Sequence, residues 1–128
     1  MTQPFAIIIE DDPRLGKVFE AALQRVGFET VLDADGNQYV VFLNNQKPDL
    51  LILDMHLPFA SGPEILAGLR AEPRWAQIPV IIVTADLFLA KSFEAKGEQV
   101  LLKPFMASRL AEVAVHLISK SQKNLTIG

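Results

Sequence analysis

The chain of 128 residues contains no cysteine, which excludes disulfide bonds, thiolate metal sites and cysteine nucleophiles. It has no run of basic residues, and its net charge of −3 gives no reason to expect binding to nucleic acid or to a membrane. No basic segment followed by a long apolar stretch stands at the N-terminus, so neither a signal peptide nor a membrane span is predicted. We therefore expect a soluble cytoplasmic protein.

Candidate linkers, internal repeats and low-complexity segments are also lacking. Half of the residues are hydrophobic and about a fifth are charged, as in a globular domain that closes a single core. We predict one domain over residues 1–128, with a flexible tail at 119–128, where polar residues follow the last predicted helix. Met1 favours a complete gene product.

Five predicted strands alternate with segments of helical character along the chain, and they span residues 5–9, 28–32, 50–53, 78–83 and 100–102. All except 28–32 are short apolar runs. These runs show no polar alternation, which is typical of parallel strands buried on both faces. Such an alternation of strands and helices predicts the α/β class, a doubly wound (βα)5 parallel sheet in a three-layer α/β/α arrangement.

Helix-capping signals mark several predicted helix starts. Asp12 precedes a proline and suits the N-cap of a helix that Gly27 ends. Residues 61–64 form a capping box for a helix that reaches to about 71. Asp35 and Gln38 have the same spacing and predict a helix over about 36–46, although that segment would also suit a strand. A further helix is predicted at 86–96, and a final helix is predicted that ends at about 118.

Polar residues that could take part in chemistry follow the first, third, fourth and fifth predicted strands, and we expect little from the end of the second. Because the carboxyl ends of parallel strands meet at one edge of a sheet, we expect their side chains to converge. Several carboxylates at one place repel one another unless a proton or a cation is present, and Mg²⁺ suits oxygen ligands. The converging residues are Glu10, Asp11 and Asp12 after the first strand, Asp54 after the third, Thr84 after the fourth and Lys103 after the fifth.

Carboxylate, magnesium, ammonium and hydroxyl groups together are what phosphoryl transfer needs. Asp54 lies in the middle of the row and is the predicted nucleophile, which would take up a phosphoryl group as an acyl phosphate. The metal and Lys103 would balance the charge on the phosphoryl oxygens.

From residue 5 to about residue 118 the sequence resembles the receiver domain of response regulators, the phosphoacceptor module of two-component signalling. The resemblance implies a flavodoxin-like sheet in the order 2-1-3-4-5. It also implies a stand-alone phosphorelay switch that is not an enzyme in the usual sense, although it assists its own phosphorylation and dephosphorylation. The segments that carry it are 9–13, 53–58 with Gly62, 78–85 and 103–105.

The resemblance assigns a magnesium site. It implies that Asp54 is the phosphorylation site and a metal ligand, that Asp11 is a direct ligand, and that Glu10 holds the ion through water. The backbone carbonyl of His56 is implied as a further ligand. Asp12 falls one place beyond the usual acidic pair, so it is either the helix cap or an additional metal residue.

The resemblance also assigns residues around the phosphoryl group. Thr84 is implied as the hydroxyl that follows the phosphoryl group on activation, and Lys103 as the lysine that pairs with it. The side chain of His56 is either a solvated loop residue or faces the phosphoryl group. We hypothesise that His56 and Asp86 flank the path of the water that hydrolyses the acyl phosphate.

Two departures from the family concern how the switch is read. The segment between Thr84 and Lys103 is shorter than usual by about one helical turn, and Val100 stands where the family commonly has an aromatic switch residue. The predicted helix within this segment is also unusually apolar over 87–93, which is typical of a partner surface. Homodimerisation and the docking of a kinase are both open at this stage.

The partners implied are a sensor histidine kinase or phosphotransfer protein and a downstream protein target. One alternative is a degenerate receiver that binds its partner without phosphorylation. Another is a phosphohydrolase or phosphotransferase of the haloacid-dehalogenase type, whose second acid two residues after the nucleophile is replaced here by His56. A flavin or nucleotide binder is disfavoured, because the turn at 10–13 is acidic and has no glycine to cradle a phosphate.

Overall fold

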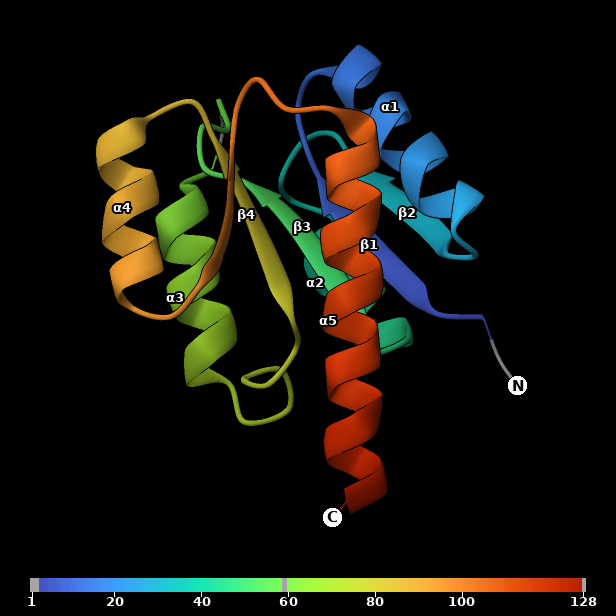
Figure 1. Cartoon of the computed structure of the whole chain (residues 1–128). Helices are drawn as coiled ribbons and strands as arrows, with labels where there is room; N and C mark the ends of the chain where they lie inside the picture. Colours follow the sequence, from blue (N-terminus) through green and yellow to red (C-terminus); the bar gives the residue numbers. More distant parts are fainter. Residues whose placement is uncertain (1–2, 59, 128) are drawn as a thin grey trace.

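Five parallel strands form one sheet in the order β2-β1-β3-β4-β5, as the computed structural model shows for residues 3–58 and 60–127 (Figure 1). The predicted α/β fold and its strand order are confirmed, and each strand boundary lies within two residues of the predicted one. The strands are β1 (Phe5–Ile9), β2 (Glu29–Asp33), β3 (Leu50–Asp54), β4 (Val80–Thr84) and β5 (Gln99–Leu102). The helices are α1 (Pro13–Arg25), α2 (Tyr39–Asn45), α3 (Gly62–Ala71), α4 (Leu87–Ala95) and α5 (Ala107–Ile127).

Two hydrophobic cores lie on opposite faces of the sheet. Successive residues of a strand point to opposite faces, so Ile7 joins one core and Ile8 the other. Helices α1 and α5 cover one face, and α2, α3 and α4 cover the other (Figure 1). All residues of β1, β3 and β4 are buried, which is why these strands consist of nearly continuous apolar runs.

Capping side chains fix the starts of α1 and α3 as predicted. The carboxylate of Asp12 accepts the N–H of Arg14 at 2.9 Å, which confirms the helix-cap interpretation of Asp12. The hydroxyl of Ser61 accepts the N–H of Glu64 at 3.3 Å. Helix α1 ends at Arg25, and Gly27, two residues later, has a φ of +99°, in the region that favours glycine.

Helix α2 differs from its predicted form. It begins at Tyr39 rather than near residue 36, and Gln38 makes no side-chain capping bond, so the predicted capping box of Asp35 and Gln38 is wrong. Asp33, a buried residue at the end of β2, caps this segment instead. Its carboxylate accepts the N–H groups of the loop that leads into α2. The donors are Asp35 at 3.1 Å and Gly36, Gln38 and Tyr39 at 2.8 Å each.

Replacing Asp33 with alanine is expected to destabilise the protein by about 3 kcal/mol or more. A buried N–H group that loses its acceptor costs about 1–3 kcal/mol, and Asp33 accepts four N–H groups, one of them buried and three partly buried. Urea unfolding followed by circular dichroism measures this loss. The matched control is Asp35→Ala, which removes an exposed carboxylate from the same loop and is expected to change stability by less than about 0.5 kcal/mol. Equal midpoints for the two variants would contradict the role of Asp33.

Helix α5 is longer than predicted. Its backbone stays helical to Ile127, well beyond the end expected near residue 118. Neither proline nor glycine occurs between Ile118 and Ile127, so no residue there stops the helix. The flexibility predicted for 119–128 stays a prediction, and residue 128 lies outside the described residues. In the described part of the chain, no helix combines the length and the apolar character needed to cross a membrane.

Candidate functional site

Three carboxylates meet at the carboxyl ends of β1 and β3, which are neighbours in the sheet. Glu10, Asp11 and Asp54 each offer an oxygen atom, and these atoms all lie within 4.8 Å of one another. Glu10 is only 1% exposed and Asp54 only 3%, while Asp11 is partly exposed. A set of three oxygen donors this close together fits a hard divalent cation such as Mg²⁺. The predicted convergence of the strand ends is confirmed for these residues.

The electrostatics of the cluster are dominated by the burial of Glu10. Burial raises its pKa from 4.5 to about 7, and the hydrogen bond and charge of Asp54 act in the same direction. The charge of Lys103 and the N–H of Asp12 lower the pKa and offset part of this rise. Glu10 therefore retains its proton close to neutral pH, in the place where a cation would otherwise balance the charge of the cluster.

Lys103 brings a positive charge to both buried carboxylates. Its Nζ lies 3.2 Å from Oε1 of Glu10 and 3.6 Å from Oδ2 of Asp54. The backbone fixes its place directly after β5, because the Lys103 N–H donates to the Thr84 carbonyl at 2.7 Å. Its side chain remains 26% exposed. The structure thus places Lys103 beside Asp54, as the sequence predicted.

The loop after Asp54 is held against the start of α3. The N–H of His56 donates to Oδ1 of Asp54 at 3.1 Å, which orients the carboxylate. A Cβ atom on Gly62 would lie 2.5 Å from Cα of Met55 and 2.8 Å from the Asp54 carbonyl oxygen. Only a glycine at this position lets the two segments approach so closely.

Thr84 is fully buried at the end of β4, and its hydroxyl has two partners. Oγ1 lies 3.2 Å from Nε2 of His56 and accepts the N–H of Asp86 at 3.0 Å. The carboxylate of Asp86 accepts the N–H of Leu89 at 3.1 Å and thereby caps α4. His56 is exposed, yet its ring is held by a specific contact and does not lie free in solvent.

Some predicted site residues lie apart from the acidic cluster. Asp12 is exposed, its carboxylate caps α1, and it is not one of the three grouped carboxylates, so the alternative of a metal role receives no support. Val100 is partly buried and packs against the core beneath α3 and α4.

The contact between His56 and Thr84 was not predicted from the sequence, because nothing in the spacing of two loops 28 residues apart indicates that they meet.

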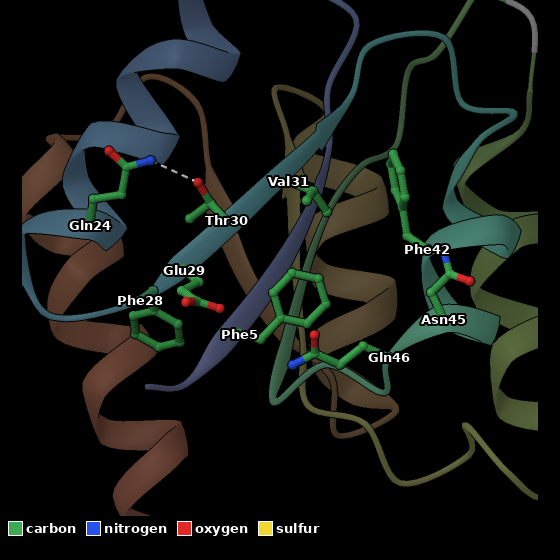
Figure 2. A pocket seen from close by; sticks show the side chains of 9 residues that line it. All are labelled: Phe5, Gln24, Phe28, Glu29, Thr30, Val31, Phe42, Asn45 and Gln46. Carbon is green, nitrogen blue, oxygen red and sulfur yellow. Dashed lines mark hydrogen bonds between the residues drawn. The ribbon is translucent and has the colours of Figure 1, made fainter. Parts of the chain in front are cut away.

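A separate pocket of about 600 Å³ lies beside the edge strand β2 (Figure 2). Phe5 and Phe28 line it near the amino ends of β1 and β2, and Gln46 lines it after α2. In Figure 2, Gln24 and Thr30 face each other across a hydrogen bond of 2.9 Å. Because this pocket lies at the amino ends of the strands, it is not part of the acidic site at their carboxyl ends.

The fold and the acidic site together define a receiver-type signalling domain, and a comparison of sequences makes the class definite. The family profile described as the response regulator receiver domain matches residues 6–115, so the chain belongs to the response-regulator receiver family of two-component systems. Members of this family are signalling proteins and not enzymes in the usual sense.

Curated relatives are similar over the same region. The DNA-binding response regulator MtrA of Mycolicibacterium smegmatis is 28% identical over 107 residues, which are 81% of this chain and 46% of that protein. The transcriptional regulatory protein AfsQ1 of Streptomyces coelicolor is 32% identical over 104 residues, 79% of this chain and 45% of that protein. The chain thus spans a little under half the length of these two relatives.

Solved structures show the same architecture. A putative response regulator from Chloroflexus aurantiacus superposes with a TM-score of 0.83 at 25% identity and covers 92% of this chain and 99% of its own. The chemotaxis response regulator CheY4 of Vibrio cholerae superposes with a TM-score of 0.80 at 21% identity, over 91% of this chain and 99% of its own. The latter similarity establishes the fold alone.

Proposed function

We propose that this chain is a phosphoacceptor switch in which Asp54 takes up a phosphoryl group from a histidine kinase or a phosphotransfer protein. The observation that carries the proposal is the surroundings of Asp54, a buried carboxylate grouped with Glu10 and Asp11 and 3.6 Å from Nζ of Lys103. The cytoplasmic location expected from the sequence, where such a donor would be met, is part of the proposal.

The chemistry assigned to Asp54 is the transfer of a phosphoryl group from a phosphorylated histidine of the donor to the free carboxylate of Asp54. Oδ1 accepts the N–H of His56, which leaves Oδ2, the oxygen nearer Lys103, to attack the phosphorus. A bond forms between this oxygen and phosphorus while the bond from phosphorus to the donor nitrogen breaks. The ammonium group of Lys103 then pairs with a phosphoryl oxygen and stabilises the charge.

Glu10, Asp11 and Asp54 are the side chains that would hold Mg²⁺, with the backbone carbonyl of His56 as the further proposed ligand. When bound, the ion neutralises charge on the phosphoryl oxygens and on the acidic cluster. The protein itself groups the three carboxylates and buries two of them. Neutralisation of their charge by a cation would therefore be strongly favourable.

The proposed readout runs from Thr84 to α4. When the hydroxyl of Thr84 turns toward the phosphoryl group, it changes its bond to the Asp86 N–H, which stands at the start of α4. This end of α4 displays Phe88 at 83% exposure and Leu87 at 54%, an apolar surface suited to a partner. The partner is either a downstream protein or a second copy of the chain. Because residue 100 is a valine, this signal must be transmitted without an aromatic ring at that position.

The experiment that tests the proposal is incubation of the protein with acetyl phosphate and Mg²⁺, followed by intact mass spectrometry. We expect a mass increase of one phosphoryl group, located by peptide mapping on the segment that contains Asp54, and no increase when a chelator removes the metal. Absence of any adduct would favour the degenerate receiver. Continuous release of phosphate with many turnovers would favour a phosphohydrolase.

We also propose that His56 and Asp86 modulate the lifetime of the phosphorylated form. Both residues contact Thr84, His56 through its ring and Asp86 through its backbone N–H, so both lie next to the residue expected to meet the phosphoryl group. Substitution of His56 with alanine is expected to change the rate of phosphate loss, measured after the donor and the metal are removed. Equal rates in the wild type and the variant would contradict this role.

A further inference from the structure

We infer that His56 is a positioning residue that holds the hydroxyl of Thr84 in the unphosphorylated chain, so that His56 and the phosphoryl group compete for the same proton. The inference rests on the proposed function of Asp54 as acceptor. It assigns the side chain of His56 a role that is distinct from that of its backbone and from any effect on water.

The hydrogen bonds of Thr84 determine the direction of this contact. A hydroxyl group has one proton to donate and accepts through its lone pairs. The N–H of Asp86 already donates to Thr84 Oγ1 at 3.0 Å, so the hydroxyl proton needs an acceptor. The acceptor present is Nε2 of His56 at 3.2 Å.

The assignment fixes the tautomer of His56. For Nε2 to accept a proton from Thr84, the imidazole must be neutral and carry its own proton on Nδ1. The opposite tautomer would present two donors to Thr84 Oγ1 and leave the buried hydroxyl proton without an acceptor. Burial of Thr84 at 0% exposure makes such an unsatisfied proton unfavourable.

Phosphorylation of Asp54 changes this balance. A phosphoryl group adds strong acceptor oxygens at the carboxyl ends of the strands, and Thr84 has a single proton to give. Donation of that proton to the phosphoryl group requires that its bond to His56 be broken. Because His56 is exposed, its ring can then bond to water, whereas Thr84 stays in the interior. The side chain of His56 thus favours the unphosphorylated arrangement.

His56 contacts the ends of both β3 and β4, so it is affected by the change from the unphosphorylated to the phosphorylated state. Its backbone N–H donates to Oδ1 of Asp54 at 3.1 Å, and its ring reaches Thr84 on β4. A phosphoryl group on Asp54 therefore acts on the same loop that carries the competing ring.

The first test needs no phosphorylation. Nitrogen NMR shifts of the imidazole, recorded at pH 8 without metal, are expected to show His56 with its proton on Nδ1. The near-isosteric variant Thr84→Val removes the hydroxyl and is expected to shift His56 toward the Nε2–H form. An unchanged tautomer in Thr84→Val, or an Nε2–H form in the wild type, would overturn the inference whatever the outcome for Asp54.

The second test measures the competition with beryllofluoride and Mg²⁺, which imitate a phosphoryl group on a carboxylate. Loss of one neutral hydrogen bond corresponds to about a two- to tenfold change in an equilibrium constant. We expect His56→Ala to bind beryllofluoride tighter by about that factor, and His56→Gln, whose amide oxygen replaces the acceptor, to stay closer to the wild type. In a Thr84→Ala background the effect of His56→Ala is expected to disappear.

Equal or weaker binding of beryllofluoride by His56→Ala would overturn the inference, and so would an effect that persists without Thr84. Failure of every variant and of the wild type to bind the analogue would count against the proposed function of Asp54, and the NMR measurement would still decide the role of His56.

Discussion

Replacement of Asp54 with asparagine is expected to abolish the uptake of a phosphoryl group while the chain stays folded. An amide oxygen is a much weaker nucleophile than a carboxylate, so the acyl phosphate does not form. Asparagine has almost the same shape, and its side-chain oxygen can still accept the His56 N–H that binds Oδ1 at 3.1 Å. Intact mass after incubation with acetyl phosphate and Mg²⁺ measures uptake, and circular dichroism checks the fold.

The matched control for this variant is Asp12→Asn. Asp12 belongs to the same acidic segment in the sequence, but its carboxylate caps α1 and lies outside the grouped carboxylates. Asparagine is an equally good N-cap residue, so we expect full phosphoryl uptake and unchanged stability. An adduct that persists in Asp54→Asn would show that another group is the acceptor. Loss of uptake in Asp12→Asn would restore the metal role that the structure does not support.

The sheet and the acidic site were predictable because burial on both faces leaves a simple signal. Ile7 and Ile8 point to different cores, and a strand with apolar residues on both faces appears in the sequence as a continuous run. A polar residue that ends such a run, as Asp54 does, is expected at the carboxyl end of its strand, where the chain leaves the core. The alternation of strands and helices placed these acids at strand ends, and the strand order implied by the family resemblance then brought Glu10 and Asp54 together without knowledge of any distance.

The loops were less predictable because their hydrogen bonds depend on tertiary packing. Asp33 and Asp35 are chemically identical candidates for capping α2, and only the buried position of Asp33 lets it collect four N–H groups. The contact between His56 and Thr84 joins two loops on different strands and has no counterpart in local spacing. Residues with the chemistry for a site were thus found from the sequence, whereas their partners required coordinates.

The raised pKa of Glu10 has a measurable consequence for stability. Between 4.5, the ordinary pKa of the carboxyl group, and about 7, its pKa in the folded protein, the folded state binds a proton that the unfolded state has lost. Without metal, the free energy of unfolding should therefore fall as the pH rises through this range, and it should level off above pH 7. A shift of this size corresponds to a loss of about 3 kcal/mol.

Other groups also titrate in this range, so the contribution of Glu10 is obtained as a difference between two proteins. Glu10→Gln has nearly the same shape and no ionisable group, and we expect its stability curve in chelator to lack the fall of about 3 kcal/mol expected for the wild type. Urea unfolding at pH 5 and at pH 8 measures both curves. Parallel curves for the two proteins would show that Glu10 titrates near its ordinary pKa.

Magnesium is expected to offset this loss of stability in the wild type. A cation binds the deprotonated cluster, so it should stabilise the folded wild type far more at pH 8 than at pH 5, where a proton occupies Glu10. At a concentration of one hundred times its dissociation constant, a ligand of the folded state adds about 2.7 kcal/mol, similar in size to the loss it offsets. In Glu10→Gln this stabilisation should be smaller and should vary less with pH. Because metal binding would relieve the cost of burying a charged Glu10, the stability of the fold would be coupled to the metal-bound state in which Asp54 accepts a phosphoryl group.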